Sequence, residues 1–216
     1  MIQNFRNCLT ITGSISDSVR FALSANNNKW FSINLRNGPK IILRKNISDK
    51  DVFIATFFSK YHRPPVRLNK APQIIDLGCN IGLTVIDFLQ EYPDAQITAV
   101  EMDFENYKLA EANTKNYPNV QLMQKAVWTE EKIVYYDGQD TQSFSVNNTL
   151  SSGFPVESIS INSILKKVPG VMIDYLKMDI EGAEYALLLE NSETSWLRNI
   201  KYISVEVHNT QKYNSE

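Results

Sequence analysis

The sequence predicts a Rossmann-like α/β fold, with a doubly wound, mostly parallel sheet covered by helices on both faces. Short apolar runs alternate with amphipathic helical segments from residue 71 onward, and such alternation is typical of parallel sheets. A glycine-containing turn leads from the first run into a helix, and acidic residues follow several later runs. Ligands of open parallel sheets lie beyond the carboxyl ends of the strands. We therefore expect the functional site at these strand ends.

Strands and helices are expected to alternate throughout residues 71–216. The expected strands are residues 73–77, 96–100, 120–127, 175–178 and 202–207. The expected helices are residues 83–91, 104–116, 161–166 and 183–190. A polar, turn-rich excursion is expected at residues 129–154. The pattern predicts one α/β domain over residues 71–216.

Residues 1–70 precede this pattern and are predicted to form an N-terminal extension that could serve as a lid. Two β-rich runs at residues 30–35 and 40–43 are separated by turn-forming residues, which favours a hairpin. A helix is expected to follow, with Ser48 or Asp49 as its N-terminal cap.

The composition excludes several classes of partner. The 216-residue chain has a formal net charge of −2 and no basic run, so it has no global attraction to nucleic acid or to anionic lipid. No segment has the apolar length that would predict a membrane span or a signal peptide. Cys8 and Cys79 are expected to be free thiols without a structural zinc. We expect a soluble, cytoplasmic protein.

The turn after the first strand carries the clearest ligand-binding signal. Gly78 and Gly82 allow positive φ and close approach of the backbone to a ligand. Cys79 and Asn80 lie between them, and the helix start that follows offers unpaired N–H groups to an anion. Asp76, at the end of the strand, would repel a diphosphate but suit an ammonium group. A ligand with an amino-acid tail fits both features, although an ordinary tight turn would also explain the glycines.

The second strand ends in Glu101 and Met102. A carboxylate in this place can accept hydrogen bonds from ribose hydroxyls, and the methionine could lie against a purine. A solvated carboxylate at a helix start is the alternative for Glu101. A dinucleotide fingerprint would need glycine at position 80 and glycine or alanine at position 83, where the chain has Asn80 and Leu83. An NAD-dependent oxidoreductase is therefore disfavoured.

Asp179 and Glu181 follow the fourth strand, where the sheet opens onto the ligand. They could orient a substrate hydroxyl, remove its proton or hold a divalent cation, or they could simply cap the next helix. His208 follows the fifth strand and, by strand alternation, projects to the same face as Glu206. His208 is a candidate base, and a structural role is equally open.

Five segments resemble the FkbM family of S-adenosylmethionine-dependent methyltransferases over residues 48–208. They are IIDLGCNIGLTVIDF, AVEMDFENYKLAEAN, QKAVW, IDYLKMDIEGAEYALL and ISVEVH. The resemblance implies a class I methyltransferase fold and O-methylation of hydroxyls on sugars, polyketides or other secondary metabolites. Transfer from a sulfonium releases a neutral thioether, so no metal is expected.

The resemblance also implies roles for individual residues. The methionine part of S-adenosylmethionine would lie against Asp76, Gly78, Cys79, Asn80 and Gly82. Its ribose would be bound by Glu101, and its adenine would be flanked by Met102, Ala126 and Val127. The methyl group and the acceptor would face Asp179 and Glu181. From the residues themselves we expect Asp179 to be the polar group beside the acceptor, with Glu181 and His208 as helpers.

Similar proteins continue past the fifth strand into an antiparallel strand pair, whereas this sequence stops at Glu216. We therefore expect a shortened C-terminal end. A non-catalytic, cofactor-binding scaffold stays open as an alternative to the enzyme. The sequence identifies neither the acceptor nor the oligomeric state.

Overall fold

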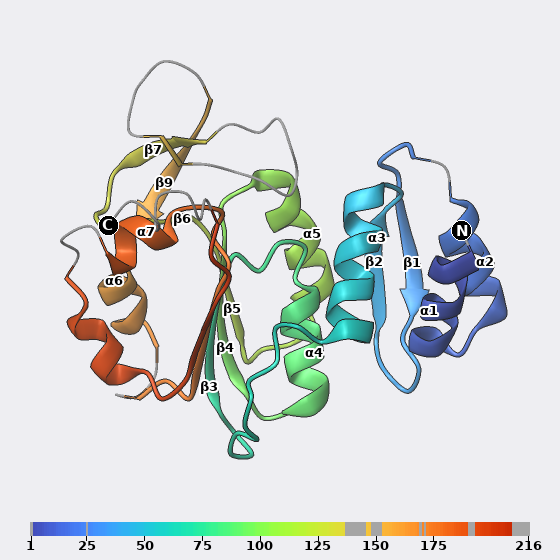
Figure 1. The fold of residues 1–216 in the computed structure, drawn as a ribbon, viewed down its shortest axis with the longest axis horizontal. Helices are drawn as coiled ribbons and strands as arrows, with labels where there is room; N and C mark the ends of the chain where they lie inside the picture. The colour runs from blue at the N-terminus through green and yellow to red at the C-terminus, as the bar shows by residue number, and fades with distance from the viewer. Residues whose placement is uncertain are drawn as a thin grey trace.

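The computed structural model describes residues 2–24, 26–136, 146–147, 153–168, 170, 172–189 and 193–208. Its centre is a five-stranded sheet in the order β11-β10-β3-β4-β5, in which every neighbouring pair is parallel (Figure 1). The strands are β3 (Gln73–Leu77), β4 (Gln96–Glu101), β5 (Val120–Gln124), β10 (Tyr175–Met178) and β11 (Ile203–Val205). The predicted Rossmann-like fold class is confirmed.

The strand order reverses direction between β3 and β10, which are neighbours in the sheet although about a hundred residues separate them. Connections on the two sides of this pair leave in opposite directions, which opens a crevice at the carboxyl ends of the strands. The register pairs Asp76 with Lys177 across this switch point. Residues that follow β3 and β10 therefore meet at one edge of the sheet.

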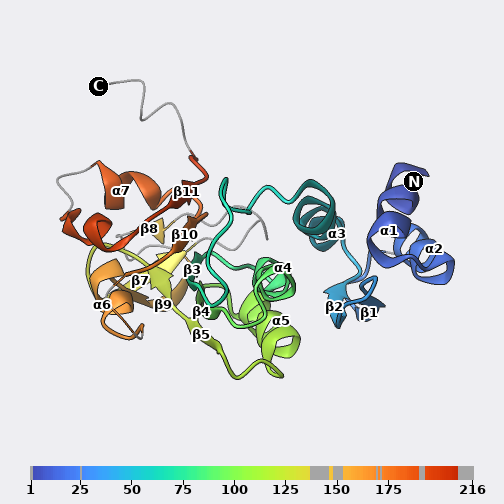
Figure 2. The ribbon, with the colours of Figure 1, turned by 90° about the horizontal axis from the view of Figure 1, so that it is seen from below.

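Helices cover both faces of the sheet (Figures 1 and 2). One face carries α4 (Leu83–Glu91) and α5 (Phe104–Thr114), and the other carries α6 (Ile161–Leu165), α7 (Glu184–Leu188) and the 3-10 helix η2 (Ser195–Asn199). The predicted helices lie where expected, within a few residues at their ends. Residue 190, the predicted end of the fourth helix, lies outside the described residues.

The N-terminal extension contains α1 (Ile2–Thr12), α2 (Ile15–Leu23), the antiparallel strands β1 (Trp30–Asn34) and β2 (Lys40–Arg44), α3 (Ile47–Ile54) and the π-helix η1 (Ala55–Ser59). The hairpin and the third helix were predicted, and the first two helices were not. The predicted cap was wrong, because the Asn46 side chain caps α3 by accepting the N–H of Asp49 at 2.7 Å. Asp49 is instead buried against Arg44, with a 2.7 Å ion pair.

The extension packs on the outer side of α4 and α5 (Figure 2). One apolar cluster joins the two parts, with Phe21, Ile33 and Phe53 from the extension and Leu83 and Leu109 from these helices. Burial of such side chains stabilises their association by about 1.5–3 kcal/mol each. The division of the chain at residue 70 stays a prediction.

The predicted single strand at 120–127 was wrong. β5 ends at Gln124, and the next strand, β6 (Ala126–Val127), leaves the central sheet to pair with β9 (Phe154–Ile159). A second sheet, of order β6-β9-β7-β8, also includes β7 (Ile133–Tyr136) and β8 (Val146–Asn147). The second sheet was not predicted, because its short strands lie in or beside the polar, turn-rich segment at residues 129–154. The rest of the excursion, residues 137–145 and 148–152, lies outside the described residues.

Two predictions from composition can be compared with the structure. None of the described helices is long and apolar enough to cross a membrane. Cys8 and Cys79 are both buried free thiols, as predicted. The last strand of the sheet is β11, and the predicted shortening beyond it concerns residues 209–216, which lie outside the described residues.

Candidate active site

A cavity of about 610 Å³ opens at the carboxyl ends of the parallel strands, where β3 and β10 adjoin. Most of the residues singled out from the sequence line it: Gly78, Cys79, Asn80, Glu101, Met102, Val127, Asp179, Glu181 and His208. Asp76, Gly82 and Ala126 are buried and do not belong to the cavity wall. The roles of all these residues toward a cofactor stay predictions.

The glycine turn after β3 adopts left-handed backbone conformations. Gly78, Asn80 and Gly82 have φ of 77°, 50° and 79°. A Cβ at Gly78 would lie 1.7 Å from the carbonyl oxygen of Asp179, so only glycine allows the loops after β3 and β10 to adjoin. Gly82 precedes α4 as its N-cap and has no side chain, so the first N–H groups of α4 donate no hydrogen bond to a capping side chain.

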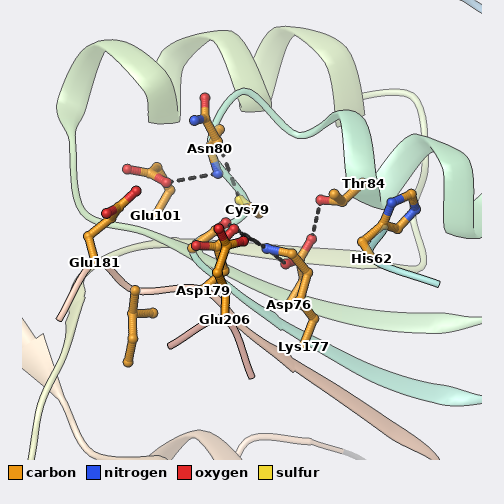
Figure 3. A network of polar contacts seen from close by, with 12 residues as sticks. His62, Asp76, Cys79, Asn80, Thr84, Glu101, Lys177, Asp179, Glu181 and Glu206 are labelled. Atoms are coloured by element: carbon orange, nitrogen blue, oxygen red, sulfur yellow. Dashed lines mark hydrogen bonds and ion pairs between the residues drawn. The ribbon is translucent and has the colours of Figure 1, made fainter. Parts of the chain in front are cut away.

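Glu101 is held by two backbone donors. The N–H of Asn80 donates to its Oε2 and the N–H of Asp103 donates to its Oε1, each at 2.8 Å (Figure 3). The side chain is buried, and burial raises its pKa to about 7. Each oxygen keeps a further lone pair, so the carboxylate can still accept hydrogen bonds from a ligand in the cavity.

A buried ionic chain runs beneath the turn from Asp76 through Lys177 to Asp179 (Figure 3). The Lys177 ammonium lies 3.5 Å from Asp76 Oδ1 and 3.1 Å from Asp179 Oδ2, and it donates to the Gly78 carbonyl at 3.3 Å. The Thr84 hydroxyl donates to the other oxygen of Asp76. Burial lowers the pKa of Lys177, but the two carboxylates outweigh burial and raise it overall. Thr84 therefore holds one oxygen of Asp76, while the other, Oδ1, faces Lys177 and has no hydrogen-bond partner among the described residues.

His208 lies at the centre of a group of carboxylates on the other side of the cavity. Its Nδ1 is 3.0 Å from Glu184 Oε1. Its Nε2 lies 3.4 Å from Glu181 Oε2, 3.8 Å from Glu206 Oε1 and 3.9 Å from Asp179 Oδ1. Burial lowers the pKa of His208, but its contact with Glu184 and the neighbouring charges raise it overall. Glu206 and His208 both line the cavity, but they follow β11, which ends at Val205, so the alternation expected from a strand reaching residue 207 does not apply to them.

The expectation that no metal takes part stays a prediction. Among the described residues, Asp179, Glu206 and His208 present ligand atoms that lie within 4.8 Å of one another. Carboxylate and imidazole donors of this kind can hold a divalent cation. The Lys177 ammonium already supplies positive charge to Asp179.

Sequence reasoning missed several residues of the site. Lys177 had a signal, because a charged residue in the apolar strand Tyr175–Met178 must be paired to be buried. Glu184 lies in the helix expected at residues 183–190, and no local pattern predicts its contact with His208, which spans 24 residues. Asp51 and Tyr61 come from the extension and line the cavity, and no motif singles them out. Burial raises the pKa of Tyr61 to about 12.

A family model described as the Methyltransferase FkbM domain matches residues 74–216. The chain belongs to the FkbM methyltransferase family. The matched region contains the glycine turn, Glu101, the β10 loop and the residues that follow β11. The expected family and fold class are thereby confirmed. The expected cofactor, S-adenosylmethionine, is confirmed as well.

Two curated relatives resemble parts of this FkbM-family chain. Malonyl-[acyl-carrier protein] O-methyltransferase of Halalkalibacterium halodurans is 37% identical over 61 residues, which are 28% of this chain and 21% of the relative. The tRNA1(Val) (adenine(37)-N6)-methyltransferase of Pseudoalteromonas translucida is 23% identical over 130 residues, 59% of this chain and 56% of the relative. The chain thus spans about a fifth and just over half of their lengths.

A solved structure also aligns with part of the chain. It is coclaurine N-methyltransferase bound to N-methylheliamine and SAH, with a TM-score of 0.27, 18% sequence identity and coverage of 36% of this chain and 23% of that one.

Proposed function

We propose that the chain is an S-adenosylmethionine-dependent O-methyltransferase whose acceptor is a hydroxyl on a sugar or another small secondary metabolite. One observation carries the proposal. A continuous cavity joins a wall that suits a nucleoside, at Gly78 and Glu101, to three groups that can accept a proton, Asp179, Glu181 and His208.

The residues of the first wall fit the cofactor. The free lone pairs of Glu101 suit the two hydroxyls of a ribose, and Met102 and Val127 offer apolar surface to a purine. The turn that leads into α4 suits the carboxylate of an amino-acid tail. The volume lies within the range of about 300–1,000 Å³ that is common for small-ligand sites.

When bound, S-adenosylmethionine supplies an electrophilic methyl group on a sulfonium. The chain must align the acceptor oxygen, take up its proton and exclude water. Lys177 holds Asp179 by an ion pair beside the cavity, so this carboxylate can orient the hydroxyl. His208 and Glu181 lie beside it and can take the proton.

The charge of the acceptor wall favours a neutral acceptor. Asp51, Asp179, Glu181 and Glu206 all line the cavity, against one lysine, Lys125. This excess of carboxylates repels an acidic acceptor such as a phosphate or a free carboxylate. A sugar hydroxyl avoids this repulsion, whereas a polynucleotide does not. The two free cysteines favour a reducing compartment, so we propose that the reaction takes place in the cytoplasm.

The experiment combines binding and turnover. S-adenosylhomocysteine should raise the melting temperature of the pure protein, and NAD should not. Labelled S-adenosylmethionine should then transfer its methyl group to a neutral member of a panel of glycosides, phenols, malonyl-acyl carrier protein and tRNA. Stabilisation by NAD alone would refute the cofactor assignment. Binding without transfer to any neutral hydroxyl would favour the non-catalytic scaffold.

A further inference from the structure

Glu184 is completely buried at the start of α7 and does not belong to the cavity wall. Its Oε2 accepts the backbone N–H of Gly182 at 2.7 Å, and its Oε1 accepts that of Ile180 at 3.1 Å. These two bonds fix the turn after β10, in which Glu181 and Gly182 have φ of 55° and 100°. The carboxylate is thus immobilised by the backbone before its contact with His208 is considered.

That contact defines the tautomer of the His208 ring. Glu184 Oε1 lies 3.0 Å from Nδ1, and a carboxylate accepts hydrogen bonds but does not donate them. Nδ1 therefore carries the proton of the neutral ring, and Nε2 is left as the acceptor. The neighbours of Nε2 are the carboxylates of Glu181, Glu206 and Asp179, which also line the cavity.

The second histidine of the chain is bound through the opposite nitrogen. His62 Nε2 lies 3.0 Å from Asp87 Oδ2, and its Nδ1 has no hydrogen-bond partner among the described residues. His62 is buried between the aromatic rings of Tyr61 and Phe88, and its ring is not part of the cavity wall. A histidine–carboxylate pair thus occurs once in the core and once at the cavity, and the two rings contact their carboxylates through opposite nitrogens.

We propose that Glu184 is the positioning residue of the site, and that it holds His208 with Nε2 toward the cavity to receive the proton of the acceptor hydroxyl. The inference rests on the proposed transfer to a hydroxyl. The O–H bond of the acceptor breaks, its proton moves to Nε2, and the electron pair of the oxygen forms the bond to the methyl carbon. The electrons of the old carbon–sulfur bond stay on sulfur. The imidazolium that results is stabilised by Glu184.

The conditions of the test follow from the charges around the ring. Glu184 faces it from α7, Glu181 and Asp179 from the β10 loop, and Glu206 from the end of β11. All four favour the imidazolium, so the tautomer must be measured at a pH at which the ring is neutral. Lys177 faces Asp179 at 3.1 Å and offsets part of this field.

The test is a ¹⁵N–¹H correlation spectrum of the imidazole rings between pH 7 and 10. The chain has 2 histidines, so both rings can be assigned with one His62 variant. We expect His208 to be protonated at Nδ1 and His62 at Nε2 in the wild-type protein. In Glu184→Gln the amide N–H₂ can donate to Nδ1, so the His208 proton should move to Nε2 while the His62 signals stay unchanged.

Kinetics provide the second readout. Glu184→Gln should lower kcat by up to about 10²- to 10⁴-fold, the range that general-base catalysis contributes, because the neutral His208 ring would then carry its proton on the nitrogen that must receive one. KM and the Kd of S-adenosylhomocysteine should change little. Glu184→Asp keeps the carboxylate and should retain more activity than Glu184→Gln. Glu193→Gln is the matched control, because Glu193 also accepts a backbone N–H, that of Ser195 at 2.8 Å, away from the cavity.

The outcomes separate the two proposals. A wild-type His208 protonated at Nε2, or an unchanged kcat in Glu184→Gln, would overturn the role of Glu184. The wild-type spectrum decides the tautomer even if the variant does not fold. Failure of S-adenosylhomocysteine to bind the wild-type protein would refute the proposed function, whatever tautomer is observed.

Discussion

The two ends of the cavity are built in different ways. At the cofactor end, the backbone determines the shape: Gly78 and Asn80 have positive φ, and Glu101 is fixed by two backbone N–H groups. At the acceptor end, side chains from separate segments meet, among them Asp179 from the residues after β10 and His208 from the residues after β11. The structure of the cofactor end depends on glycine and close packing, whereas that of the acceptor end depends on charged side chains.

This difference separates binding from chemistry. The cofactor end includes a contact between two loops that a single methyl group would break. The acceptor end contains groups with larger exposed fractions, such as the Glu206 side chain at 52%. Substitutions at the first end should therefore affect folding and cofactor affinity together. Those at the second should affect turnover or acceptor affinity and leave the fold intact.

The largest effect is expected for Gly78→Ala. The new Cβ would lie 1.7 Å from the Asp179 carbonyl oxygen, and φ is 77°. We expect calorimetry to detect no binding of S-adenosylhomocysteine, and the free energy of unfolding in urea to fall by about 3 kcal/mol or more.

Gly170→Ala separates packing from backbone strain in this prediction. Gly170 has φ of 101°, but a Cβ there would meet nothing within 4 Å. It should cost only about 1 kcal/mol of stability and leave cofactor affinity unchanged. Equal costs in the two variants would show that the contact between the β3 and β10 loops does not matter.

His208→Ala tests the acceptor end. Loss of the base should lower kcat by about 10²- to 10⁴-fold, while the Kd of S-adenosylhomocysteine and the urea midpoint stay near wild type. His62→Ala should instead lower stability and leave kcat near the wild-type value, because His62 is buried and bound to Asp87 in the core. Its free energy of unfolding should fall by about 2 kcal/mol. A large loss of stability in His208→Ala would assign this ring a structural role.

The raised pKa of Glu101 predicts that the affinity for S-adenosylhomocysteine depends on pH. Burial raises its pKa to about 7, so the carboxylate is charged above pH 7 and takes up a proton below it. The charged form accepts hydrogen bonds more strongly, and the affinity for S-adenosylhomocysteine should fall about tenfold from pH 8 to pH 6. Titration calorimetry of Glu101→Gln should give weaker binding without this dependence. An equally steep dependence in Glu101→Gln would point to another group.

The same contrast explains what could be predicted from the sequence. The cofactor end follows two consecutive strands, so Gly78, Asn80 and Glu101 could be found from local patterns, and all three line the cavity. The Asp76 carboxylate was expected to face an ammonium group of the ligand. In the structure it also faces the ammonium of Lys177 at 3.5 Å, because the register of β3 and β10 places the two residues side by side. Its role toward a ligand stays a prediction.

The acceptor end could be predicted only in part. Asp179, Glu181 and His208 were found because each follows a strand, and these strands end at one edge of the sheet. Asp51 and Tyr61 could not be found, because the packing of the extension on α4 and α5 brings them to the cavity. A pattern within one segment carries no information about such contacts.

The smallest effect is expected for Asp51→Asn. This side chain lines the cavity from α3 and contributes one of its negative charges. Its loss should change the KM of a neutral acceptor by about two- to fivefold, in line with the modest energies of exposed charges, and should weaken the discrimination against an acidic analogue of that acceptor. Asp94→Asn is the control, since Asp94 precedes β4 at the opposite edge of the sheet and is exposed. If KM changed by the same factor in both variants, the effect would be due to the net charge of the protein. A change in Asp51→Asn alone, with an unaltered Kd for S-adenosylhomocysteine, would place the N-terminal extension at the acceptor end of the site.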